Sequence, residues 1–170
     1  MVTATALPSR AEERLKALRI DLPRPPSPLG AYVEAVRSGN LLFLSGILPV
    51  QSGRPRYSGT IGRDLSPEEG REAARLAAVN AIAVAREHLR SLDRVTRVIR
   101  LGVALVAASD FMDHPKIADG ASELLRDVFG EARMSTRIVL GVATLPLGVP
   151  VELELIFEVK DHVDAEGEAR

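Results

Sequence analysis

Two charged residues in the second half of the chain, Arg137 and Glu152, have the side chains best suited to chemistry. Arg137 begins the apolar run 137–143, and a guanidinium in that place can hold a carboxylate in a two-pronged salt bridge. Glu152 lies in a stretch whose alternation predicts a neighbouring strand, where a carboxylate can orient a water or relay a proton. The residues alone leave a second interpretation open, in which these charges form ion pairs on a solvated sheet face.

Other candidate sites are weaker. Ser45 precedes Gly46, but the surrounding residues lack the Gly-x-Ser-x-Gly pattern of a serine hydrolase. His114 follows Asp110 and Asp113, yet acidic residues at a predicted helix start are explained by the helix dipole, so we expect no metal site. The chain has no cysteine, which excludes disulfides, thiolate metal sites and a cysteine nucleophile.

The composition limits the partners. The chain has 170 residues and a formal net charge of −1, so it has no overall positive field for nucleic acid, and we interpret its scattered arginines as solvated surface. No apolar run reaches the roughly 18 residues that a membrane span needs, and the N-terminus lacks the order of a secretion signal. We therefore expect a cytoplasmic protein with neither a membrane nor a nucleic acid as its partner.

The pattern of residues predicts one α+β domain. We expect a short helix capped by Ser9 and Glu12, a proline-rich connector, and a hairpin of strands 31–36 and 41–45. Ser66 predicts the start of a long helix that ends near residue 92. A strand over 95–106, a helix over 110–129 and strands over 136–143 and 149–159 follow. Two helices then cover one face of a mixed sheet, and the other face must be hidden by self-association, for which a ring is economical.

Several short motifs occur in a characteristic order. They are Gly30-Ala31-Tyr32-Val33, the run 38–46, Asp110-Phe111, Arg137 ahead of Leu145-Pro146, and Val151-Glu152-Leu153-Glu154. Together they resemble the Rid/YjgF family, also labelled endoribonuclease L-PSP, which has a chorismate-mutase-like fold. The leading helix and the run 119–131 are similar to its longer YjgF-like subgroup. The expected division is an N-terminal helix and connector (1–29), a YjgF-like domain (30–160) and a polar tail (161–170).

The resemblance implies a homotrimer with a barrel-like core and clefts between subunits. It implies hydrolysis of reactive 2-imino and 2-enamino acids to 2-keto acids and ammonia, without a metal or an organic cofactor. By the same resemblance, Arg137 holds the carboxylate of a small substrate and Glu152 helps to position the attacking water. Tyr32, Ser45 and Gly46 line the cleft.

The sequence departs from the family pattern at two cleft positions. Ile47 stands where many members have Gln, and Pro115 or His114 stands where short members place an Asn. These departures leave the substrate open. They also leave three other functions open. These are a non-catalytic trimer that binds small carboxylates or has a regulatory role, the endoribonuclease that the family label names, and an isomerase that shares the fold.

Overall fold

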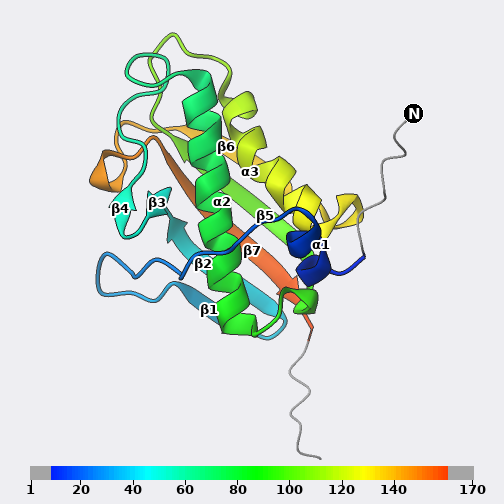
Figure 1. The fold of residues 1–170 in the computed structure, drawn as a ribbon. Helices are drawn as coiled ribbons and strands as arrows, with labels where there is room; N and C mark the ends of the chain where they lie inside the picture. Colours follow the sequence, from blue (N-terminus) through cyan, green and yellow to red (C-terminus); the bar gives the residue numbers. More distant parts are fainter. Residues whose placement is uncertain (1–8, 161–170) are drawn as a thin grey trace, which may run out of the picture.

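The computed structural model describes residues 9–160, so the predicted tail lies outside the described residues. Three helices and seven strands are present in this part of the chain (Figure 1). The helices are α1 (Ala11–Ala17), α2 (Pro67–Leu89) and α3 (His114–Phe129). The strands are β1 (Ala35–Ser38), β2 (Leu41–Ile47), β3 (Val50–Gln51), β4 (Arg54–Pro55), β5 (Val95–Leu105), β6 (Thr136–Gly141) and β7 (Val151–Val159).

Five of the strands form one mixed sheet in the order β1-β2-β7-β5-β6. All neighbours in this sheet are antiparallel except β5 and β6, which run parallel through the crossover helix α3. Strands β3 and β4 form a separate two-stranded ribbon. The prediction of an α+β fold with a mixed sheet is confirmed.

Helices α2 and α3 lie side by side on one face of this sheet, as predicted (Figure 1). The expected capping box starts α2: Ser66 accepts a hydrogen bond from the Glu69 backbone, and the Glu69 side chain accepts one from the Ser66 backbone. The two helices approach closely where Gly120 of α3 meets Arg71 of α2. A Cβ at Gly120 would overlap the Arg71 carbonyl oxygen, so the crossing requires glycine.

The hydrophobic core fills the space between these helices and the sheet. The alternation predicted for the last strand is present in β7, whose buried side chains all face the helices: Val151, Leu153, Leu155, Phe157 and Val159. The alanine-rich stripe of α2 lets the helix approach the sheet closely, because alanine adds little bulk. Within the described residues, Asn80 of α2 is the one polar side chain that is buried.

The opposite face of the sheet is open. Val36, Phe43, Ile138 and Leu140 expose about half of their surface there, between 39% and 54%. The short helix α1 does not cover them, because it packs against α3 and the turn at residues 92–94 on the helical side. These four apolar side chains share the face with Glu152, Glu154 and Glu158 of β7. Exposed apolar side chains of this kind are typical of an interface between subunits, so self-association stays a prediction that this face supports.

Three predicted boundaries were wrong by three residues or more, and the end of β6 and the start of β7 were wrong by two. The first strand begins at Ala35 instead of residue 31, because the chain at residues 29–34 leaves the sheet and bends around a pocket. Helix α3 begins at His114 instead of residue 110, and Pro115 then occupies its first turn, where proline fits best. Helix α2 ends at Leu89 instead of residue 92, because Arg90 adopts a left-handed conformation (φ 64°).

The capping box expected for the first helix does not form. Arg10 occupies the cap position without a side-chain cap. Glu12, which was expected to close the box with Ser9, accepts a hydrogen bond from the Leu92 backbone at 3.0 Å and pairs with Arg86 at 3.1 Å. The Glu12 carboxylate therefore binds residues distant in the sequence instead of capping its own helix.

Candidate functional site

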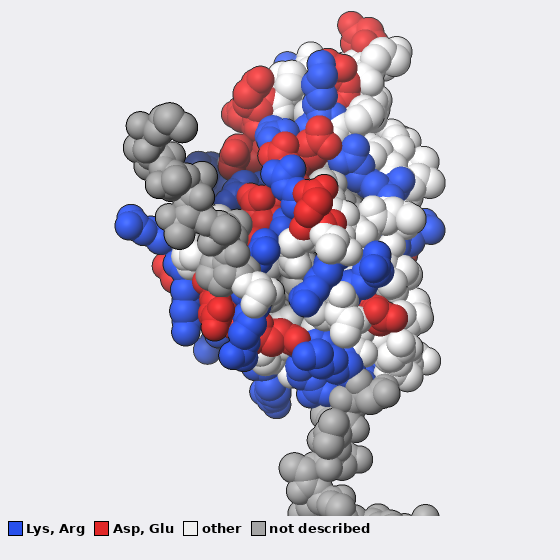
Figure 2. All heavy atoms as spheres, turned by 90° about the vertical axis from the view of Figure 1, so that its right-hand side faces the viewer, with Lys and Arg blue, Asp and Glu red and all other residues white. Residues whose placement is uncertain are grey.

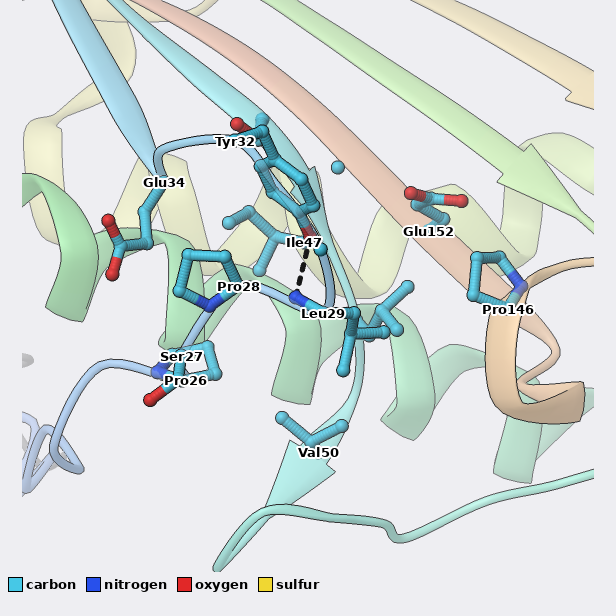
Figure 3. Close-up of a pocket in the computed structure, with 14 residues that line it drawn as sticks. Pro26, Ser27, Pro28, Leu29, Tyr32, Glu34, Ile47, Val50, Pro146 and Glu152 are labelled. Carbon is cyan, nitrogen blue, oxygen red and sulfur yellow. Dashed lines mark hydrogen bonds between the residues drawn. The ribbon is translucent and has the colours of Figure 1, made fainter.

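A pocket of about 500 Å³ opens where the proline-rich connector meets the end of β2 (Figure 3). One wall is the connector at residues 26–30 with Tyr32 and Glu34. The floor is the end of β2 and the residues after it, 45–50, and the far side is formed by Pro146 and by Glu152 of β7. Four of the five residues predicted for the site, Tyr32, Ser45, Gly46 and Glu152, therefore lie together.

Glu152 is the chemically distinctive residue of this pocket. Its side chain is half-buried, and burial raises its pKa above the ordinary value of 4.5. No other described residue gives it a hydrogen bond or an ion pair. A carboxyl group with a raised pKa and no internal partner is suited to giving and taking a proton.

Gly46 makes the room for this carboxylate. The pairing of β2 with β7 shifts register between Leu44 and Ile47, so that β2 carries one extra residue there. A Cβ at Gly46 would overlap the carboxylate of Glu152. A glycine at this bulge thus lets Glu152 lie against β2 instead of being pushed away from it.

Tyr32 and Ser45 hold the bent segment that forms the pocket wall. The Tyr32 hydroxyl accepts a hydrogen bond from the Leu29 backbone at 3.1 Å, which Figure 3 shows as a dashed line. The Ser45 hydroxyl donates to the Val33 carbonyl, and the Ser45 backbone donates to the Glu34 carbonyl at 2.9 Å. The Ser45 hydroxyl therefore anchors the wall and is not poised as a nucleophile.

Asn80 is a supporting residue that our reading of the sequence missed. Its Nδ2 atom donates two hydrogen bonds of 2.9 Å, to the carbonyls of Leu48 and Val50, and both of these residues line the pocket. Because Asn80 is only 1% exposed, these contacts are shielded from water. The signal in the sequence was a polar residue within the alanine-rich inward stripe of a helix.

Arg137 lies apart from the other four predicted residues. It follows the open-face residue Thr136 along β6 and pairs in register with the buried Leu101, so its side chain is on the helical side of the sheet. Its Nη1 atom donates to Asp119 at 2.7 Å and to Ser122 at 3.0 Å, both on α3. Within one chain, the structure does not bring Arg137 together with Glu152.

The contacts of Arg137 use only part of its hydrogen-bonding capacity. A guanidinium carries five N–H donors, and the two on Nη1 go to Asp119 and Ser122. The Nε and Nη2 atoms have no partner among the described residues. This remaining edge has the geometry that binds a carboxylate through two parallel hydrogen bonds.

The positions at which the sequence departs from the family pattern have different surroundings. Ile47 is buried and lines the pocket beside Gly46. Pro115 occupies the first turn of α3, and the ring of His114 packs at 5.7 Å from that of Phe111. Residues 9–160 contain no group of three or more His, Cys, Asp or Glu side chains arranged to hold a metal ion.

The surface carries mixed charge. On the face that Figure 2 shows, Lys and Arg side chains are interleaved with Asp and Glu. The ion pairs of the surface include Arg71 with Glu123 and Arg126 with Asp127. No described helix has the length and apolar character that crossing a membrane requires.

Comparison with known proteins gives consistent matches over nearly the whole chain. The family described as "YjgF/chorismate mutase-like, putative endoribonuclease" matches residues 12–159. Protein TCP17 of Trypanosoma cruzi is 36% identical over 153 residues, which are 89% of this chain and 96% of that protein. A 2-iminobutanoate/2-iminopropanoate deaminase of Dermatophagoides farinae is 28% identical over 142 residues, 83% of this chain and 95% of the deaminase.

A solved structure shows the same fold. The crystal structure of a putative endoribonuclease from Shewanella oneidensis superposes with a TM-score of 0.85 at 35% identity. The superposition covers 88% of this chain and 99% of that one.

Proposed function

Because the chain belongs to the YjgF/chorismate mutase-like family, we propose that it hydrolyses 2-imino and 2-enamino acids to 2-keto acids and ammonia. The observation that carries this proposal is the Glu152 carboxyl, which is half-buried at one side of a largely apolar pocket and has no side-chain partner among residues 9–160. The similarity to a 2-iminobutanoate/2-iminopropanoate deaminase supports the same reaction class.

The pocket of one chain lacks a group that would hold the substrate carboxylate. Its lining residues include Glu34 and Glu152 but no Lys, Arg or His. We assign the missing cation to Arg137 of a second copy, whose Nε and Nη2 atoms bind none of the described residues. The exposed apolar face of the sheet supports a ring of copies, and we propose a homotrimer with three equivalent clefts.

The reaction then needs orientation and one proton relay. The 2-imino acid carries an electrophilic carbon, C2, and its carboxylate binds Arg137. Glu152 takes a proton from a water as the water oxygen bonds to C2 of the protonated imine, whose nitrogen becomes a neutral amine. Protonated Glu152 returns that proton to the amine. The C2–N bond breaks, ammonia leaves, and the hydroxyl proton passes through Glu152 to ammonia as the keto group forms.

The test is an imine-hydrolysis assay in which an amino-acid oxidase supplies the 2-imino acid. We expect the protein to accelerate release of the keto acid and Glu152→Gln to slow it about 10²–10⁴-fold, the usual contribution of a positioned acid or base. Glu154→Gln is the matched control, because Glu154 lies on the same strand outside the pocket lining.

Three outcomes would oppose the proposal. A wild-type protein that does not accelerate imine hydrolysis but binds 2-oxobutanoate favours a ligand-binding trimer. Degradation of RNA that disappears with Arg137→Ala favours the endoribonuclease that the family description names. A monomeric mass in light scattering at micromolar concentration contradicts the shared cleft.

A further inference from the structure

We infer that the proline-rich connector makes this pocket selective for 2-imino acids with long or branched apolar side chains. This inference rests on the proposed function and goes beyond it, because the same chemistry on a small imine needs only Glu152 and Arg137. It follows from what surrounds the rest of the cavity.

The cavity is larger than a small imine requires. Its volume of about 500 Å³ lies in the range of about 300–1,000 Å³ that accommodates drug-sized ligands. An imine derived from alanine carries a single methyl group on its reactive carbon. Such a substrate would fill only a small part of the cavity as one chain forms it, whereas a leucine or phenylalanine side chain would contact more of its walls.

The surface that this side chain would meet is largely apolar. Figure 3 shows Glu152 at one side of the pocket and Pro26 and Pro28 at the other, with Leu29 and Ile47 between them and Val50 below Leu29. The one charged group in the lining besides Glu152 is Glu34, also an acid. An apolar side chain is therefore accepted, whereas the second carboxylate of an imine derived from glutamate or aspartate would meet no cationic group in this lining.

The connector is built to keep this wall in place. Proline fixes φ at Pro26 and Pro28, and the Tyr32 hydroxyl holds the Leu29 backbone at 3.1 Å. Leu29 itself is 56% exposed. A fixed, exposed leucine beside an open cavity offers apolar contact without a cost for ordering the wall when ligand binds.

The size of the effect follows from the area that is buried. Each fully buried methylene group strengthens binding about fourfold. The leucine side chain has three more carbons than that of alanine, so we expect kcat/KM for the imine of leucine to exceed that for the imine of alanine by at least about tenfold.

The experiment compares kcat/KM for imines generated from alanine, leucine, phenylalanine and glutamate. We expect the leucine and phenylalanine imines to be preferred at least tenfold over the alanine imine, and the glutamate imine to be the poorest substrate. Leu29→Ser should remove most of the preference for leucine over alanine. Leu29→Met, which keeps an apolar wall, should retain it.

A second measurement separates failure of this inference from failure of the proposed function. Equal kcat/KM for all four imines would overturn the inference and leave the hydrolase intact. If no imine is hydrolysed, calorimetry with 4-methyl-2-oxopentanoate and pyruvate decides. Binding of the former at least tenfold tighter, lost in Leu29→Ser, would support the selectivity, and equal binding would overturn it.

Discussion

The close approach of Gly46 to Glu152 gives the sharpest test of the site. Alanine at position 46 would place its Cβ where the Glu152 carboxylate lies. The obstructed atoms are the end of a flexible side chain, so the carboxylate can rotate away and the backbone does not have to move. We therefore expect Gly46→Ala to fold with a free energy of unfolding within about 1 kcal/mol of the wild type.

The effect on catalysis should be much larger. If Glu152 relays the proton, its displacement costs about 10²–10⁴ in rate, which is about 2.7–5.4 kcal/mol of transition-state stabilisation. Initial rates of keto-acid release under saturating oxidase measure this loss, and chemical denaturation measures stability on the same preparation. Another glycine of the same hairpin, Gly39, cannot serve as a control for Gly46→Ala. Its φ of 58° is one that alanine rarely adopts, so Gly39→Ala would strain the backbone.

A double-mutant cycle makes this prediction specific to the pair. In the Glu152→Gln background the relay is already lost, so adding Gly46→Ala should reduce the rate by less than about threefold. If the two losses instead multiply, Gly46 acts independently of Glu152 and the assigned role of the glycine is wrong. Unchanged activity in Gly46→Ala alone would show that the Glu152 carboxylate does not act from its position against β2.

Three further predictions concern other parts of the site. Asn80→Ala leaves the carbonyls of Leu48 and Val50 without their donor, so it should cost about 2–4 kcal/mol and lower Tm by about 4–16 °C in a calorimetric scan. Burial raises the pKa of Glu152 above 4.5, so the wild type should lose stability as pH rises from about 4.5 through the folded-state pKa. Glu152→Gln should therefore be more stable than the wild type above that interval and equal to it below, in pH-dependent unfolding. Arg137→Ala removes a partly exposed ion pair worth about 0–1 kcal/mol, yet should weaken binding of 2-oxobutanoate at least tenfold by calorimetry, and unchanged binding would exclude it from the cleft.

The sequence predicted most reliably those elements that local patterns determine. Ser66, Pro67 and Glu69 specify the start of α2 through contacts within one helical turn, and the structure forms them. The alternation of β7 identifies its buried face, because period two is a property of any half-buried strand. The predictions failed where a tertiary contact outcompeted the local pattern, as at Glu12, whose carboxylate binds the Leu92 backbone.

The candidate site was only partly predictable for the same reason. Tyr32, Ser45, Gly46 and Glu152 come together because β2 pairs with β7, a register that the alternation of both strands favours. The wall at Pro26 to Leu29 could not be predicted, because it depends on how the connector crosses the surface. Whether Arg137 faces the helices or the open side depends on the parallel register of β5 with β6, and a shift of one residue would reverse it.

The positions of Arg137 and Glu152 decide how a complete site can be assembled. Glu152 pairs in register with Ala104 of β5 on the open side of the sheet, and Arg137 binds α3 on the helical side. The sheet stands between them, and a rotation of either side chain cannot cross it. This placement supports the proposed cleft, in which a small substrate contacts Glu152 of one chain and Arg137 of another. In that proposed cleft, Asp119 and Ser122 would fix one edge of the guanidinium and leave the other edge for a substrate that the neighbouring copy presents.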